Sequence, residues 1–363
     1  MPKSAITLEA LPVGYGDCLF VTCPIGRRTW RMLVDTGPDE TYPTLKARLA
    51  KLPADVRGQR FIDLFVVTHI DHDHIGSVAQ LLDDHSLGLS FGDIWFNAPL
   101  QPAVRGVAEG EALAKLLGAS AAALPWNKAF GGKPAVTGGD GGFTEVSMPA
   151  GAPRITLLSP TPASMKDLFK AWDKELARLR SKELAPRAAE AASRDPASLD
   201  LKALAANITA IDHSVPNASS IAILLEHRGA SLLLGADAVP SVMVPALQPL
   251  ARQRQQPGGL TLDAIKLCHH GSRANLTNDL LATVRAEHYV FSTNGAIYNH
   301  PDDEAVARVL MHGGRQPTLS FNYPTERNRR WAEPVLRATY GYQVRYPMAG
   351  QSGVSLELPA RAT

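Results

Sequence analysis

The sequence of 363 residues has no long hydrophobic run, few cysteines and no excess of charge of either sign. Its longest apolar stretches, such as residues 219–225 and 231–235, have the length of strands, whereas a membrane-spanning helix needs about 20 apolar residues. We therefore expect no membrane span and no membrane partner. The N-terminal segment also lacks the basic start and apolar core of a secretory signal, so we expect it to enter the fold directly.

The three cysteines, Cys18, Cys23 and Cys268, form no CxxC pair and are too few for a disulfide framework. A reducing, cytoplasmic location is therefore expected. The 37 Lys and Arg residues nearly balance the 35 Asp and Glu residues, which leaves a net charge of +2. Bulk charge thus predicts neither nucleic-acid nor membrane binding, and a partner of either kind needs a local basic patch.

With 45% hydrophobic residues, the chain is apolar enough to bury a large core. Strand-length runs cluster in both halves, and helical patterns follow them. The continuous apolar run at 61–68 is typical of a strand covered on both faces. Two strand-rich halves with helices outside predict an α/β fold, a four-layer α/β/β/α sandwich. We expect strands at 6–13, 18–26, 29–37, 61–68, 93–98, 154–160, 263–272 and 287–294, a strand-turn-strand pattern at 219–238, two final strands within 342–358, and helices at 40–52, 77–85, 240–252, 275–285 and 302–312.

Residues 100–210 interrupt this alternation. Six glycines lie within residues 131–142, which we expect to form a mobile loop. Residues 163–205 are rich in Ala, Lys, Glu, Arg and Leu, and we interpret them as two or three exposed helices. The segment 100–210 is then an insertion or lid within a single domain over residues 1–363. A solvated helical pair without a functional role is the alternative.

The most informative segment directly follows the predicted strand at 61–68. Five of the six residues at positions 69–74 can bind a metal ion: His69, Asp71, His72, Asp73 and His74. Carboxylates crowded together repel one another unless a cation compensates their charge. Open α/β sheets also place ligands at the carboxyl ends of their strands. The segment therefore predicts a site for a divalent cation.

This segment resembles the His-x-His-x-Asp-His motif of the metallo-β-lactamase superfamily, with its four ligand positions at His69, Asp71, Asp73 and His74. Asp71 replaces the usual second histidine, a variant similar to the soluble hydrolase domain of ComEC-type DNA-internalisation competence proteins. Further motifs agree in order over roughly residues 5–300, apart from the insertion. They are Val13-Gly14-Tyr15-Gly16-Asp17, Asp35-Thr36-Gly37, Asn217-Ala218-Ser219, Gly235-Ala236-Asp237, residues 265–272, Ser292 and Asn299-His300-Pro301. The resemblance implies a metallo-β-lactamase sandwich.

The same resemblance implies two cation positions joined by a bridging carboxylate, Asp237. His69 and Asp71 would belong to one position, and Asp73 and His74 to the other. Cations held in this way would number one or two.

The other site residues follow the family's pattern less closely. His270 is implied as the last ligand and His269 as a neighbour of the substrate, although the two roles can be exchanged. Asn217 stands where the wider superfamily has a third-motif histidine, and an amide is a poor ligand for a soft cation. The first position is therefore expected to be weakly held or empty. The many carboxylates favour manganese, and the imidazoles keep zinc as a candidate.

A bound cation lowers the pKa of its water to about 7, and we expect Asp73 to orient the resulting hydroxide. His300 is a candidate for contacting a phosphate or protonating a leaving group. Asp35 is expected to anchor the metal loop and Ser272 to orient a substrate oxygen or cap a helix.

The predicted function is hydrolysis of phosphodiesters by attack of a metal-bound hydroxide. The enzyme would be a nuclease or phosphodiesterase, acting on nucleic acid or on a small phosphodiester. Hydrolysis of a small non-nucleic substrate, a lactone, a thioester or a small phosphodiester, is the alternative within the same fold. A non-catalytic binding scaffold is the alternative of another class.

Overall fold

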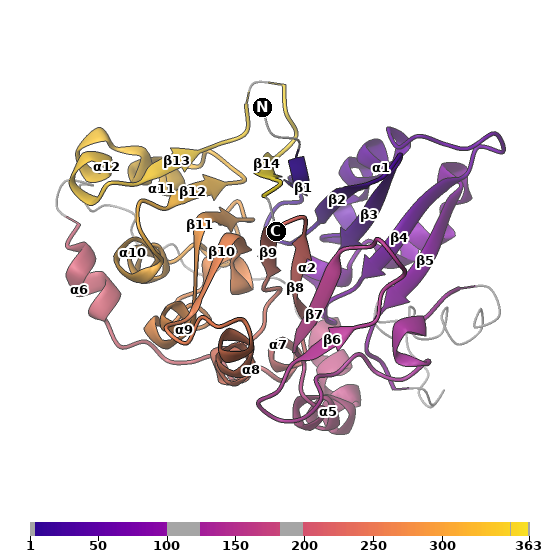
Figure 1. Ribbon diagram of the computed structural model, residues 1–363, viewed down its shortest axis with the longest axis horizontal. Coiled ribbons are helices and arrows are strands. Elements are labelled where there is room, and N and C mark those ends of the chain that lie inside the picture. The colour runs from indigo at the N-terminus through magenta and orange to yellow at the C-terminus, as the bar shows by residue number, and fades with distance from the viewer. Residues whose placement is uncertain (1–3, 100–123, 182–198, 349, 362–363) are drawn as a thin grey trace.

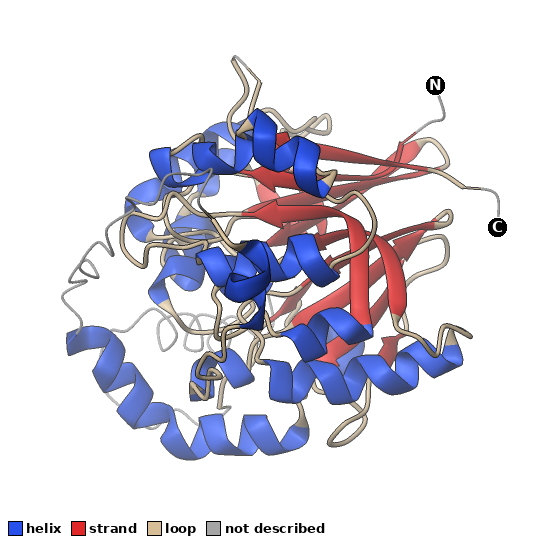
Figure 2. Ribbon diagram, turned by 90° about the vertical axis from the view of Figure 1, so that its left-hand side faces the viewer, coloured by secondary structure: helices blue, strands red, loops and turns tan. Residues whose placement is uncertain are grey.

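Two β-sheets pack face to face between two layers of helices in the computed structural model, which describes residues 4–99, 124–181, 199–348 and 350–361 (Figure 1). Within these residues the first sheet has six strands in the order β14-β1-β2-β3-β4-β5. The second has eight strands in the order β13-β12-β11-β10-β9-β8-β7-β6. Figure 2 shows helices on both sides of the strands. The predicted four-layer α/β/β/α sandwich is confirmed.

The first sheet changes from antiparallel to parallel pairing in its middle. β14, β1, β2 and β3 pair antiparallel, whereas β3, β4 and β5 run parallel. The carboxyl ends of β3 and β4 therefore lie at the same edge. The strands are β1 (Ser4–Ala10), β2 (Leu19–Ile25), β3 (Arg28–Val34), β4 (Arg60–Val66), β5 (Leu89–Trp95) and β14 (Val354–Pro359).

The second sheet is parallel from β9 to β13 and antiparallel from β6 to β9. The carboxyl ends of β9, β10 and β11 therefore meet at one edge, like those of β3 and β4. The strands are β6 (Thr144–Val146), β7 (Arg154–Ser159), β8 (Ala222–His227), β9 (Ala230–Leu234), β10 (Leu260–Lys266), β11 (Val284–Phe291), β12 (Thr318–Phe321) and β13 (Gln343–Arg345).

Three hydrophobic cores separate the four layers. The central core joins the inner faces of both sheets, with Leu64 and Val66 of β4 opposite Leu232 and Leu234 of β9. A second core lies between the first sheet and its helices, and a third between the second sheet and its helices. Alternate residues of β4 enter different cores, so this strand is covered on both faces, as its apolar run predicts.

The longer helices pack against the outer faces of the two sheets. α1 (Tyr42–Ala50), α3 (Val78–Asp83) and α5 (Pro162–Ser181) cover the first sheet. The second sheet is covered by α6 (Leu201–Ala206), α8 (Pro240–Gln253), α9 (Asn278–Thr283) and α10 (Asp303–His312). The other helices are short: α2 (His72–Ile75), α7 (Val215–Ala218), α11 (Glu326–Arg329) and α12 (Pro334–Tyr340). None of the helices in the described part of the chain is long and apolar enough to span a bilayer.

The segment predicted as an insertion is described only in part. Residues 100–123 and 182–198, which include part of the predicted helices, lie outside the described residues. Between them, β6 and β7 extend the second sheet, and α5 buries Met165, Leu168 and Trp172 against the first sheet. This part of 100–210 thus belongs to the sandwich, and α5 is not simply exposed. The single domain with an insertion or lid stays a prediction.

Candidate metal centre

Strands from both sheets deliver polar side chains to one place. His69 and Asp71 follow β4, and Asp35 follows β3 in the first sheet. Asp237 follows β9, and the histidine pair of residues 269–270 follows β10 in the second sheet. The carboxyl ends of parallel strands from the two sheets therefore converge at one site, although its residues come from distant parts of the chain.

The metal-binding segment itself is a short turn followed by α2. Asp73 and His74 lie in α2 and are buried, whereas His72 is partly exposed, with its Nε2 3.2 Å from Asp39 Oδ1. The turn at Gly16 packs directly against this segment, because an ideal Cβ at Gly16 would lie 1.9 Å from the carbonyl oxygen of Asp73. The first hairpin thus supports the loop through backbone contact.

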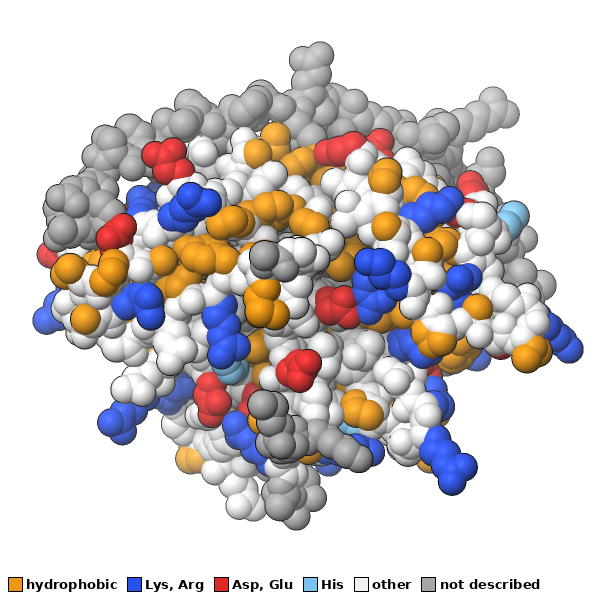
Figure 3. Space-filling model, turned by 90° about the horizontal axis from the view of Figure 1, so that it is seen from above, with side chains coloured by type: hydrophobic (Ala, Val, Ile, Leu, Met, Phe, Trp, Pro, Cys, Tyr) orange, Lys and Arg blue, Asp and Glu red, His pale blue; other side chains and the backbone are white. Residues whose placement is uncertain are grey.

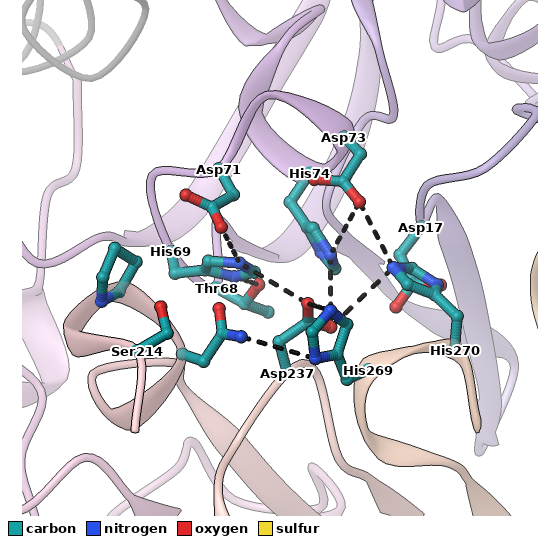
Figure 4. Close-up of polar contacts among 12 residues, drawn as sticks. Asp17, Thr68, His69, Asp71, Asp73, His74, Ser214, Asp237, His269 and His270 are labelled. Atoms are coloured by element: carbon teal, nitrogen blue, oxygen red, sulfur yellow. Dashed lines mark hydrogen bonds and ion pairs between the residues drawn. The ribbon is translucent and has the colours of Figure 1, made fainter. Parts of the chain in front are cut away.

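Asp237 lies at the centre of the cluster, and its two oxygens face different partners (Figure 4). Its Oδ1 lies 3.3 Å from His74 Nε2 and 3.8 Å from His270 Nε2. Asp73 completes this group, because its Oδ2 lies 3.4 Å from His270 Nε2 and 3.9 Å from His74 Nε2. We call Asp73, His74 and His270, together with Asp237 Oδ1, the second donor set.

The other oxygen of Asp237 faces a separate group. Its Oδ2 lies 3.6 Å from His269 Nε2 and 3.9 Å from His69 Nε2. Asp71 Oδ2 lies 4.0 Å from His69 Nε2. We call His69, Asp71 and His269, together with Asp237 Oδ2, the first donor set. Asp237 thus lies where a carboxylate bridging two cations would lie.

The spacing of these atoms fits bound cations. Two donors that each lie 2.0–2.2 Å from one ion are at most about 4.4 Å apart, and each of the seven donor distances given above is shorter than that. In addition, four of the donor atoms are buried without a hydrogen-bond partner: His69 Nε2, His74 Nε2, His270 Nε2 and Asp237 Oδ1. Buried polar atoms are rarely left unpaired, so this chain's residues fit divalent cations.

Hydrogen bonds behind the donors fix the orientation of two rings. His74 Nδ1 lies 2.8 Å from Asp35 Oδ2, and Asp35 also accepts hydrogen bonds from the backbone N–H and the hydroxyl of Thr68. His270 Nδ1 donates to the carbonyl oxygen of Ser292 at 2.8 Å. In both rings Nε2 is then left to face the cluster, which is how metal-binding histidines are usually oriented.

Charges within the cluster shift the pKa of its members in opposite directions. Burial lowers the pKa of His74, but the carboxylates of Asp237, Asp35 and Asp73 together outweigh it and raise the pKa well above its usual value. For His269, burial is likewise outweighed by Asp237 and Asp212 together with the hydrogen bond to Asn275, and the pKa rises to about 9. Burial and the charge of His74 lower the pKa of His69 to about 4. The cation-free cluster therefore holds protons on His74 and His269 at pH 7.

Three further residues support the donors, although the sequence predicts no role for them. Lys266 pairs with Asp17, whose other oxygen lies 3.4 Å from His270 Nδ1. Both are buried, and in the sequence they stand only within the motifs at residues 13–17 and 265–272. Asp212 accepts a hydrogen bond of 2.6 Å from Asn217 and lies 3.4 Å from His269 Nδ1. No local motif marks Asp212, because its partners come from elsewhere in the chain.

The other candidate residues surround the donor sets. The ring of His300 packs 5.3 Å from that of His269, and its Nδ1 lies 3.5 Å from Asp302. Burial lowers the pKa of His300, so its ring is neutral at pH 7. Ser272 is buried, and its hydroxyl accepts a hydrogen bond from the Ala274 backbone at 3.3 Å. The helix that follows, α9, begins at Asn278 and is capped by Thr277, so Ser272 does not have the capping role considered from the sequence.

A second group of possible ligands lies apart from this cluster. Within the described residues, Asp39, Glu40 and His72 also bring donor atoms within 4.8 Å of one another. Asp39 and Glu40 are exposed to solvent, and exposed acidic groups of this kind are common without a bound ion.

The fold and the buried Asp and His cluster define the class of protein. Residues 11–102 match the family model described as the metallo-beta-lactamase superfamily. The match gives these residues as part of a metallo-beta-lactamase superfamily domain, and the two-sheet sandwich agrees with that fold. With the candidate metal site, this match gives a hydrolase of the metallo-beta-lactamase type as the coarse assignment.

Among particular proteins, a stretch of 91 residues is 30% identical to ComE operon protein 3 of Bacillus subtilis (strain 168). The match covers 22% of this chain and 12% of that protein, so the chain corresponds to a small part of its relative.

Solved structures give a likeness over nearly the whole chain. YhfI from Bacillus subtilis, a metallo-beta-lactamase fold protein, is 12% identical with a TM-score of 0.43, over 98% of this chain and 100% of that chain. Zn²⁺-bound PqqB from Methylobacterium extorquens is 12% identical with a TM-score of 0.46, over 97% and 100%. A diphosphatase from the PhnP family is 12% identical with a TM-score of 0.40, over 99% and 100%.

Proposed function

We propose that this chain is a metal-dependent hydrolase that cleaves phosphodiester bonds, with nucleic acid as the first candidate substrate. The observation that supports it is the position of Asp237 between two donor sets, each of which contains a further carboxylate. A pair of cations bridged by one carboxylate suits in-line displacement at phosphorus, since one ion stabilises the attacking oxygen and the other the leaving oxygen.

Cations bound here would polarise the phosphoryl oxygen and lower the pKa of a bound water to about 7. The donor chemistry supports manganese or zinc, because three carboxylates and four imidazoles provide both hard and borderline ligands.

The chain's own residues hold and orient the reactants. Burial raises the pKa of Asp73, but the charge of His74 and the hydrogen bond and charge of His270 together outweigh it and lower the pKa to about 2, so Asp73 is ionised at neutral pH. An ionised carboxylate at this position can accept a hydrogen bond from the attacking water and orient it. His300, neutral at pH 7, is suited to donate a hydrogen bond to a phosphate oxygen rather than to supply a proton.

An aromatic row beside the cluster supports a substrate that carries a flat ring. The rings of Tyr15 and Tyr298 meet edge to face at 6.0 Å, and Tyr298 stacks on His300 at 6.1 Å. Tyr298 is only partly buried. Aromatic side chains next to a phosphodiesterase centre can stack on nucleobases without requiring one particular sequence.

The surface charge favours a short or locally bound substrate over a long electrostatic track. Lys and Arg side chains are scattered among Asp and Glu side chains on the face shown in Figure 3. The chain's net charge of +2 agrees with that mixture. A small phosphodiester is therefore the second candidate substrate of the same site.

Hydrolysis assays separate these substrates. The metal-loaded protein is incubated with labelled single-stranded DNA, double-stranded DNA, RNA, bis(p-nitrophenyl) phosphate and a lactone. We expect cleavage of the phosphodiesters, lost in Asp73→Asn and retained in Asp55→Asn, which makes the same change at an exposed turn. Cleavage of the lactone alone, or of no substrate by protein that holds its metal, would overturn the proposed function.

A further inference from the structure

The imidazole of His269 has surroundings that point to a metal ligand as well as to a neighbour of the substrate. It is the least buried histidine of the cluster, with 24% of its side chain exposed. Its backbone is left-handed, at φ 47° and ψ 50°, a strained conformation for a residue other than glycine. Such strain at a functional position usually serves to aim a side chain.

The hydrogen bonds around Nδ1 determine which nitrogen of His269 faces the cluster. The amide nitrogen of Asn275 donates to Asp212 Oδ2 at 2.9 Å and to the carbonyl oxygen of Asp237 at 3.1 Å. The amide oxygen of Asn275 is therefore the atom that lies 2.9 Å from His269 Nδ1. Because that oxygen only accepts, Nδ1 carries a hydrogen and the lone pair of a neutral ring is on Nε2.

That lone pair faces a carboxylate. His269 Nε2 lies 3.6 Å from Asp237 Oδ2, the same oxygen that His69 Nε2 approaches to 3.9 Å. Two imidazole nitrogens that point at one carboxylate oxygen form the donor arrangement of a metal site. A cation 2.0–2.2 Å from each donor satisfies this spacing and takes the place of the proton on His269.

From this geometry we propose that His269 is a ligand of the first cation position, together with His69, Asp71 and Asp237. This inference rests on the proposed metal-dependent function. The first position then has three ligands besides the bridging Asp237, namely His69, Asp71 and His269. Asn217, which lies beside this position, offers only an amide. Both histidines after β10 then bind metal, His269 at the first position and His270 at the second.

Asp212 and Asn275 become positioning residues under the same proposal. Asp212 orients Asn275 and Asn217 through its Oδ2, and Asn275 in turn holds His269. Partners of this kind behind a metal-binding histidine typically change metal affinity 10–100-fold when they are replaced. Asp212→Ala is therefore expected to weaken the first cation by that factor and to leave the second unchanged.

The test counts bound metal and needs no substrate. Metal content per chain is measured by mass spectrometry after loading with Mn²⁺ or Zn²⁺ and desalting, and affinities are measured by isothermal titration calorimetry. We expect two equivalents for the wild type, one for His269→Gln and two for His300→Gln. The control removes a neighbouring histidine that belongs to neither donor set. The equivalent that remains in His269→Gln should keep its wild-type affinity, which also shows that the variant is folded.

Two results would overturn the inference. One is a His269→Gln variant that keeps both equivalents with affinities within about twofold of the wild type, as expected for a residue that contacts only the substrate. The other is a wild-type chain that holds a single equivalent, lost in His270→Gln but not in His269→Gln. If such a chain still cleaves a phosphodiester, the proposed function stands and only the assignment of His269 fails.

Discussion

Asp237 combines two tasks that single carboxylates in proteins usually perform separately. Each of its oxygens faces a different pair of imidazoles, so removal of the charge affects both donor sets at once. Burial raises the pKa of Asp237, but His74 and the histidines after β10 outweigh it and hold the pKa well below its usual range. The carboxylate is therefore ionised in the cation-free chain and ready to bind.

Asp35 tests whether the residues behind the ligands set metal affinity. In Asp35→Asn, an amide replaces the carboxylate that faces His74 Nδ1 and the Thr68 hydroxyl, so at least one of these contacts is weakened. We expect metal affinity at the second position to fall 10–100-fold, measured by calorimetry. Asp55→Asn is the control, and equal affinity in the two variants would contradict the role of Asp35.

Lys266 tests a buried charge pair that no catalytic argument requires. Its ammonium and the carboxylate of Asp17 are almost fully buried, and Lys266→Met leaves that carboxylate without its partner. We expect a loss of about 3–5 kcal/mol in the free energy of unfolding, measured by denaturant titration.

The double variant Lys266→Met/Asp17→Leu separates charge from packing. Replacing both partners with apolar residues removes the uncompensated charge, so much of the lost stability should return. A double variant that is less stable than Lys266→Met would show that Asp17 stabilises the fold independently of Lys266, for instance through its contact with His270.

At the scale of elements, the cluster depends on how closely the first hairpin approaches the metal-binding segment. The carbonyl oxygen of Asp73 accepts a hydrogen bond of 3.1 Å from the backbone of Asp17, next to Gly16. A side chain at residue 16 has no room there, so the turn and α2 have to move together.

Gly16→Ala tests this contact. A Cβ placed 1.9 Å from a backbone oxygen forces the turn away from α2, which should lower both the melting temperature and metal affinity. Gly258→Ala is the matched control, because it lies on an exposed loop with nothing within 4 Å of the added carbon. Equal melting temperatures and metal affinities for the two variants would contradict the proposed support.

The sequence predicted the elements that carry a clear periodic pattern. The buried run at 61–68 became β4, and the helix expected at 302–312 became α10. The strand β12 was missed because its four residues are too few to show a period. The strand expected at 263–272 ends early, at Lys266, because the histidines that follow adopt left-handed backbone and leave the sheet.

The site residues likewise fall into two groups, those that a local motif marks in the sequence and those that only the fold brings together. Asp71, Asp73 and their neighbouring histidines were found because they stand together in one short segment. Asp212 and Asn275 were missed because only the fold brings them to His269, and neither belongs to a motif. The separation of the donors into two sets around Asp237 likewise depends on side-chain directions, which spacing along the chain does not define.

At the scale of the whole molecule, the cluster links the two sheets. Its donors come from β4 on one side and from β9 and β10 on the other, so a bound cation joins elements that otherwise meet only through apolar contacts and a few polar ones. Unfolding disperses these donors. The cations should therefore bind the folded chain much more tightly than the unfolded one.

Metal affinity should depend on pH in a defined direction. His269 has a pKa raised to about 9, so at pH 7 a cation has to displace its proton. Affinity is therefore expected to rise from pH 7 to pH 9. Calorimetry in buffers of different ionisation enthalpy should show proton release on binding at pH 7, and binding without proton release would contradict the raised pKa.

The cation-free chain should respond to pH in the opposite sense. A raised folded-state pKa gives stability that is fully present below the unfolded value of 6.5 and is lost as the pH rises through the folded value. The chelated protein should therefore lose stability between about pH 6.5 and pH 9, while cation binding strengthens over that range. The stability gained from metal is thus largest under mildly alkaline conditions.

A free cation concentration of 100 times Kd should add about 2.7 kcal/mol per site to the free energy of unfolding, measured by calorimetric unfolding with and without chelator. In Asp237→Asn the unfolding curves measured with and without chelator should nearly coincide, because both donor sets lose their shared charge. A wild-type chain whose melting temperature is the same with and without chelator would mean that no cation joins the sheets.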